Sequence, residues 1–127
     1  MAGGSGPTGT EITVVGYAAG YSSSGDKLTA IGKAAGRMAT GSDNTCIGME
    51  AGYSNTSAQK NVFVGKEAGY GNKTGSQNVV VGSDSGEGVW NNADYTNSVI
   101  LGCEAGAILT SSNSCLLYTS DAADEHR

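Results

Sequence analysis

The sequence predicts an all-β protein, folded as a parallel β-solenoid or β-roll of six coils of 16–20 residues. The first observation behind this prediction is an internal repeat, in which an apolar triplet precedes a glycine and a second glycine follows four residues later. The unit recurs six times, with steps of 16, 16, 17, 17 and 20 residues. The first glycines are Gly16, Gly32, Gly48, Gly65, Gly82 and Gly102, and the second are Gly20, Gly36, Gly52, Gly69, Gly86 and Gly106.

Composition and unit length are the other two observations. Glycine makes up 21 of the 127 residues, and the abundance of Gly, Ser, Thr and Asn disfavours long amphipathic helices. A unit of 16 or 17 residues is too short for a strand–helix–strand crossover but long enough for one solenoid coil. No apolar run reaches the roughly 18 residues of a membrane span. We therefore expect no membrane insertion. Because the net charge is −5, we also expect no nucleic-acid partner.

Each unit is expected to begin with a three-residue strand directly before its first glycine. These triplets are rich in β-branched residues, which is typical of strands. Side chains alternate between the two faces of a strand, yet both faces are largely apolar here, as in strands that are covered on both sides. A small residue precedes each second glycine, and we expect the glycines to supply positive φ or close backbone approach at a corner.

The second apolar face of the strands requires a cover that the chain does not supply. One face can fill the narrow interior of the roll, and no helical pattern is present to cover the other. We therefore expect a homotrimer, with three rolls around one axis. The alternative is a monomer with an exposed apolar ladder, which would be an aggregation hazard.

The units Asn44–Gln59 and Asn61–Gln77 resemble the Gly-rich repeats of bacteriophage tail fibres, which often precede a self-cleaving intramolecular chaperone domain. They are also similar to the head repeats of trimeric autotransporter adhesins, which form left-handed parallel β-rolls, although the units here are longer. The resemblance covers Ile12 to about Asn113. It implies a structural fibre module for host attachment, in a virion or on an extracellular surface, with a glycan or protein receptor.

Two other functions stay open at this point. The first is the head of a bacterial trimeric surface adhesin. The second, weaker one is an ice-binding solenoid, which needs a flat threonine ladder. Thr13, Thr29 and Thr45 begin such a ladder, but valine replaces threonine in the next three units.

The two ends differ from the repeat region at 12–114. Residues 1–11 contain three Gly-x-y triplets and read as a Gly-rich leader or a short collagen-like linker. Residues 115–127 form a non-repeat tail, and Cys115–Glu125 within it resembles the translation of a sequencing adapter. We therefore expect the tail to be an artefact that packs poorly or as a makeshift cap, and the natural chain to differ after Ser114. The alternative is a genuine capping tail.

The residues do not suggest an enzyme or a cofactor. The single histidine, His126, lies in the tail, so no Ser-His or Cys-His pair is expected. The three cysteines lack the short spacing of a zinc site. Cys46 occupies a strand position and is expected in the core, whereas Cys103 occupies a variable position that we expect to be exposed.

Acidic residues recur two positions after the first glycine, at Glu50, Glu67, Asp84 and Glu104. Stacked at the strand spacing, they would repel one another and raise each other's pKa. We favour a solvated face with splayed side chains. Relief by a bound cation, or by Lys33 and Lys66, is the alternative, and a repeated ladder is a poor match for the two differentiated carboxylates of a glycosidase.

Two further ladders are predicted. Asn44, Asn61 and Asn78 share one position, where stacked amides can hydrogen-bond from coil to coil. The second ladder comprises Tyr21, Arg37, Tyr53 and Tyr70. A tyrosine stack that covers a corner is favoured over one that binds sugar rings.

The fifth unit carries an insertion, Glu87–Asn97. Long loops on rigid scaffolds often carry function, and aromatic, amide and carboxylate groups together suit a receptor contact. The candidate ligand-binding residues are therefore Trp90, Asn91, Asn92, Asp94 and Tyr95. The equal alternative is that the aromatic side chains pack back over the roll. Glycosylation patterns at Asn55 and Asn72 occupy equivalent turn positions and carry little weight.

Overall fold

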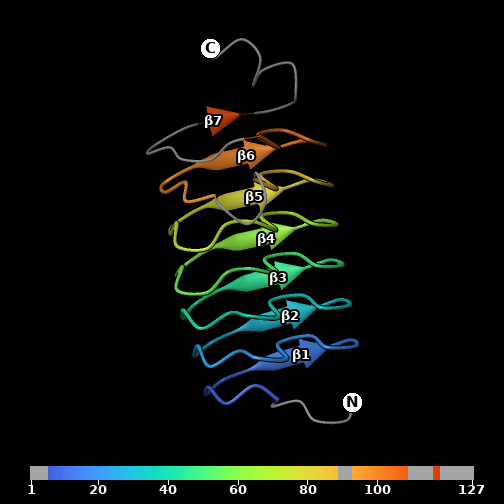
Figure 1. Cartoon of the computed structure of the whole chain (residues 1–127), viewed down its shortest axis with the longest axis vertical. Coiled ribbons are helices and arrows are strands. Elements are labelled where there is room, and N and C mark those ends of the chain that lie inside the picture. The colour runs from blue at the N-terminus through green and yellow to red at the C-terminus, as the bar shows by residue number, and fades with distance from the viewer. Residues whose placement is uncertain (1–5, 89–92, 109–115, 118–127) are drawn as a thin grey trace.

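A computed structural model describes residues 6–88, 93–108 and 116–117. Its strands stack one above another along a single axis, all pointing the same way, with one strand in each coil (Figure 1). The strands are β1 Thr13–Val15, β2 Thr29–Ile31, β3 Thr45–Ile47, β4 Val62–Val64, β5 Val79–Val81, β6 Val99–Leu101 and β7 Leu116–Leu117. This confirms the prediction of an all-β parallel solenoid, and each of the six predicted triplets is a strand.

Neighbouring strands pair in parallel and in register. Thr13 lies opposite Thr29, Thr29 opposite Thr45, and the pairing continues position by position to β6. β7 adds to the same sheet, with Leu116 opposite Val99. Equivalent residues of successive coils therefore form ladders. None of the described residues forms a helix of the length and apolarity that crossing a membrane requires.

The first glycine of each unit permits close stacking of the backbone. These glycines have φ between 113° and 138°, which side chains rarely tolerate. A Cβ atom on Gly65 would lie 2.5 Å from the carbonyl oxygen of Gly82 in the next coil. The position therefore requires glycine twice over, by its φ and by its distance from the neighbouring backbone.

The second glycine makes room for the interior side chains. Gly52 and Gly69 have φ of 59° and 62°, and a Cβ on either would collide with the ring of Phe63. Phe63 itself is fully buried, in the middle position of β4. The largest side chain of the middle column thus fits because its two glycine neighbours have no side chain.

The interior also contains the predicted asparagine ladder. The Nδ2 atom of Asn61 donates to Oδ1 of Asn44 at 3.2 Å, and Nδ2 of Asn78 donates to Oδ1 of Asn61 at 3.0 Å. Each Asn61 and Asn78 amide also donates to a corner carbonyl, on Gly75 and Tyr95 respectively. All three asparagines are buried and paired, which confirms their structural role.

Two columns of non-glycine residues adopt the left-handed region, a feature that the sequence did not reveal. The column two residues before the strands is Glu11, Lys27, Asp43, Lys60, Gln77 and Asn97, and the column two residues after the first glycine is Ala18, Ala34, Glu50, Glu67, Asp84 and Glu104. Their φ angles lie between 54° and 63°. The surrounding ladder of hydrogen bonds holds this backbone conformation in coil after coil.

The first coil begins before Ile12. The backbone nitrogen of Thr8 donates to the carbonyl oxygen of Ser23 at 3.0 Å, and that of Lys27 donates to Thr10 at 2.8 Å. The backbone nitrogen of Thr10 also donates to the Asp26 carboxylate at 2.7 Å, which lowers the pKa of Asp26. Residues from Thr8 onward therefore belong to the first coil and form hydrogen bonds to the residues that lead into β2.

Candidate functional site

The outer face of the sheet is the largest feature that the fold leaves uncovered. In each of β1 to β6 the middle side chain points into the roll, and the first and third point away from it. The third-position side chains form a continuous apolar ladder of Val15, Ile31, Ile47, Val64, Val81 and Leu101. Val15 is 57% exposed, and Ile31 and Ile47 are 37% and 36% exposed.

The first-position side chains run beside this ladder. They are threonine in β1 to β3 and valine in β4 to β6, with Val79 at 39% exposure. Among the described elements, each strand contacts only its neighbours in the sheet, so no strand packs on this face. We call these two columns the outer apolar face. The prediction that a second apolar face of the strands is left uncovered is confirmed for the described residues of the single chain.

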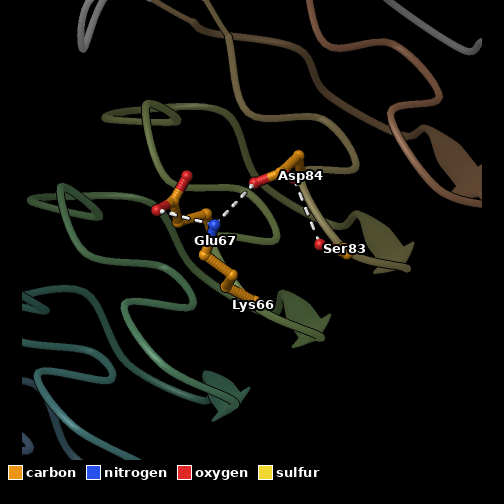
Figure 2. A network of polar contacts seen from close by, with 4 residues as sticks. All are labelled: Lys66, Glu67, Ser83 and Asp84. Carbon is orange, nitrogen blue, oxygen red and sulfur yellow. Dashed lines mark hydrogen bonds and ion pairs between the residues drawn. The ribbon is translucent and has the colours of Figure 1, made fainter.

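The carboxylate ladder lies at the corner that follows the strands. Lys66 Nζ lies 3.5 Å from a carboxylate oxygen of Glu67 and 3.9 Å from one of Asp84, so it bridges two coils (Figure 2). The Ser83 hydroxyl donates to Asp84 at 3.1 Å. The alternative of relief by lysine holds for Lys66, which forms these ion pairs, and no ion pair is found for Lys33 among the described residues.

This corner perturbs the titration of its acids. Burial raises the pKa of Glu67, with a further contribution from Asp84, while Lys66 opposes the rise. Burial likewise raises the pKa of Glu87, and Asp84 adds to it. Conversely, Asp84 and then Glu67 raise the pKa of Lys66. Oxygen atoms of Glu67, Asp84 and Glu87 approach within 4.8 Å of one another, but three carboxylates with a lysine among them fall short of a calcium shell.

The tyrosine ladder forms a mixed stack with Arg37. The Arg37 guanidinium carbon lies 5.2 Å from the ring centre of Tyr21 and 5.4 Å from that of Tyr53. The rings of Tyr53 and Tyr70 stack at 4.9 Å with an angle of 12° between their planes. The stack lines a surface hollow of about 370 Å³ next to Tyr17 and Lys33. The predicted stack is therefore present, and Tyr21, Arg37 and Tyr53 border this hollow.

The structure describes only two of the five residues predicted to bind a ligand, and these two differ in exposure. Trp90, Asn91 and Asn92 lie outside the described residues. Asp94 is exposed, whereas Tyr95 is fully buried and its hydroxyl donates to the Gly86 carbonyl at 2.6 Å. The proposal of Tyr95 as a ligand contact is corrected, because its ring fills the interior and cannot reach a ligand on the surface.

The cysteines and the two asparagines of the glycosylation patterns have the following exposure in the structure. Cys46 is buried as predicted, and burial raises its pKa to about 12, so it stays a thiol. Cys103 is exposed, also as predicted, and is a free thiol. Asn55 and Asn72 are fully buried, so neither amide is accessible to a glycosylating enzyme in the folded chain.

Comparison of the chain with protein-family models, with curated proteins and with solved structures found no match.

Proposed function

We propose that the chain is a structural module of a homotrimeric attachment fibre, of the kind found in phage tails. The observation that carries this proposal is the outer apolar face, which runs along the sheet as two columns of largely apolar side chains and is uncovered in the single chain. Full burial of one exposed valine, isoleucine or leucine side chain stabilises by about 1.5–3 kcal/mol, and covering this column would add the part of that energy that corresponds to its remaining exposed area.

The direction of the coils favours a fibre over a compact oligomer. The strands stack along one axis from β1 at one end to β7 at the other (Figure 1). Three parallel copies around a common axis would each turn the outer apolar face inward, and the coil axis of each copy would then run along the fibre. Resemblance to tail-fibre repeats, at Asn44–Gln59 and Asn61–Gln77, supports the same arrangement.

A bacterial adhesin head would use the same trimer and would differ in what anchors it to the cell. An ice-binding surface is less well supported, since the first column of the outer apolar face changes from threonine to valine after β3. A thermal-hysteresis measurement on the purified chain separates that function from attachment.

The test of assembly is the molar mass of the full chain in solution, measured by light scattering during size-exclusion chromatography. We expect three times the chain mass of 12.7 kDa. Ile47→Lys should give a monomer, because it places a charge in the middle of the outer apolar face. A monodisperse wild-type monomer would overturn the proposal.

Met49→Lys is the matched control for that variant. Met49 lies in the same coil and is 37% exposed, against 36% for Ile47, but it is not in the outer apolar face. Its own column already carries Lys33 and Lys66 in other coils, so lysine is accommodated there. Met49→Lys should keep the trimer mass, and a monomer for both variants would show that added charge alone dissociates the chains.

A further inference from the structure

The surface hollow beside the tyrosine ladder combines aromatic and cationic side chains. Its volume is about 370 Å³, large enough for one sugar ring and its substituents. It spans the corners of the first three coils. The lining residues are Tyr17, Ala18, Tyr21, Lys33, Ala34, Arg37, Glu50 and Tyr53.

Arg37 is held rigidly at this hollow. Its guanidinium lies between the rings of Tyr21 and Tyr53, and its Nη1 atom donates to the Tyr53 hydroxyl. A guanidinium has five N–H donors, and this is the single side-chain hydrogen bond that the described residues give it. The remaining donors are therefore positioned for an acceptor, with little side-chain entropy left to lose on binding.

The charge of the hollow is opposite to that of the chain. Lys33 and Arg37 line it with a single carboxylate, Glu50, and no ion pair of either cation is found among the described residues. The hollow thus carries a formal charge of +1, on a chain whose net charge is −5. A local positive site on an otherwise acidic chain favours a ligand that places an anionic group at this hollow.

Tyr17 supplies an open aromatic face. Its side chain is 68% exposed. Among the large hydrophobic side chains that the structure describes, only that of Ile108 is more exposed. An exposed tyrosine ring beside a shallow hollow offers an apolar surface to the C–H face of a sugar and a hydroxyl to its polar edge. Inorganic anions would leave this ring unused.

We propose that this hollow binds an acidic sugar, with the carboxylate of the sugar on Arg37 and Lys33 and its ring against Tyr17. Arginine and a carboxylate form two parallel hydrogen bonds, which orients the sugar as well as attracting it. The inference rests on the proposed attachment function, because it names the class of receptor, an acidic glycan. It assigns the contact to the tyrosine corner, away from the insertion at Glu87–Asn97.

The experiment is a calorimetric titration of the full chain with tri-galacturonate. The neutral probe is the methyl ester of the same trisaccharide, and the anion without a ring is inorganic phosphate. We expect saturable binding of tri-galacturonate alone. Arg37→Gln and Lys33→Gln should each weaken it about tenfold, and Tyr17→Ser about fivefold.

Lys73→Gln is the matched control, since Lys73 is an exposed lysine that does not line the hollow. It removes the same charge and should leave the affinity unchanged. Because Lys33 and Tyr17 are exposed, their variants keep the test valid even where Arg37→Gln unfolds the corner. Melting curves by circular dichroism show which variants are folded.

Three outcomes would overturn the proposal: no saturable binding of tri-galacturonate, equal binding of its ester or of phosphate, or an affinity that the hollow variants leave unchanged. The assembly is measured on the same sample by light scattering. A monomer that binds tri-galacturonate keeps this site and removes the trimer, whereas a trimer that does not bind removes the site alone.

Discussion

The two faces of the same sheet differ in how strictly they restrict residue type. Inside the roll, each middle side chain is matched to its neighbours: Phe63 fits because Gly52 and Gly69 have no side chain, and the asparagine ladder leaves none of its amides unpaired. On the outer apolar face, threonine, valine, isoleucine and leucine replace one another along the columns without any change in register. The interior therefore specifies the coil, and the outer face keeps only β-branched or apolar character. Substitutions that act on one face alone test this contrast.

The largest expected effect is that of Gly65→Ala. The new Cβ would lie 2.5 Å from the Gly82 carbonyl oxygen, at a φ of 131° that alanine rarely adopts, so the backbone of two coils must shift. We expect a loss of about 4 kcal/mol or more in the free energy of unfolding, measured by urea denaturation.

Gly36→Ala is the control for that substitution. Gly36 has a φ of 54°, and its nearest atoms, on the side chains of Ala30 and Leu28, would be 3.3 Å from the new Cβ. Alanine already occupies the left-handed region at Ala34, so a cost of about 1–2 kcal/mol is expected. Equal losses for the two variants would contradict the argument that backbone approach sets the first glycine column.

Asn61→Ala is expected to have the second-largest effect. The Asn61 side chain accepts from both the backbone nitrogen and Nδ2 of Asn78, at 3.0 Å each, and donates to Gly75 and Asn44. Its removal leaves buried donors of Asn78 without that acceptor. We expect a loss of about 2–3 kcal/mol in the same denaturation measurement, and an unchanged value would show that the ladder is not stabilising.

Asn55→Ala should act in the opposite direction. Asn55 is also fully buried, but neither its Oδ1 nor its Nδ2 has a hydrogen-bond partner among the described residues. The equivalent position in the preceding coil is Ala39, which is fully buried as well, so alanine fits the column. We expect a gain of about 1 kcal/mol, because removal of an unpaired buried amide ends its desolvation penalty.

Asn72→Ala is the matched comparison one coil further on. The Asn72 amide donates to the Gly75 carbonyl at 2.8 Å and accepts from the Gly75 nitrogen at 3.2 Å. The same substitution should therefore destabilise here. A loss at both positions would mean that an ordered water satisfies Asn55 in solution.

Sequence reasoning recovered the features that depend on a residue type shared by all coils. Glycine at two positions and a β-branched triplet before the first located the strands, and Cys46 and the asparagine ladder followed from their columns. The left-handed columns escaped it, because residues as different as Lys60 and Asn97 occupy one of them and only the backbone is common. A conformation imposed by neighbouring coils leaves no signature in the side chains.

The burial of Tyr95 was also not predicted from the sequence, for a different reason. The insertion at Glu87–Asn97 breaks the period, so its residues were judged by chemistry and not by column. Counting back four residues from each strand places Tyr95 in the column of Gly41, Ala58 and Gly75, all of which are buried. That count would have predicted an interior residue. The sequence placed Tyr21, Arg37 and Tyr53 in one column, but it did not join them to Tyr17 and Lys33, because the hollow needs side chains from several columns, whose distances the sequence does not give.

The smallest predicted effect concerns charge at the corner outside the roll. Because the pKa of Glu67 is higher in the folded chain than its ordinary value of 4.5, the folded state binds the proton more tightly than the unfolded state. Its contribution to stability is therefore complete below the unfolded pKa and is lost as the pH rises through the folded pKa. The melting temperature should rise by about 1–2 °C between neutral pH and pH 4.5, and Glu67→Gln should flatten this slope while raising stability at neutral pH.

Glu11→Gln is the control for Glu67→Gln. It removes the same charge from an exposed residue of the other left-handed column, where Gln77 already occurs. The dependence of the melting temperature on pH should persist in this variant. This result separates the effect of the burial of Glu67 beside Asp84 from a general effect of net charge. A slope of opposite sign in the wild-type chain would mean that acids with lowered pKa, such as Asp26, dominate its acid response. Charge would then affect stability mainly through the hydrogen bonds that Thr10 donates to Asp26, and the contrast between a specified interior and a permissive exterior would hold for shape but not for charge.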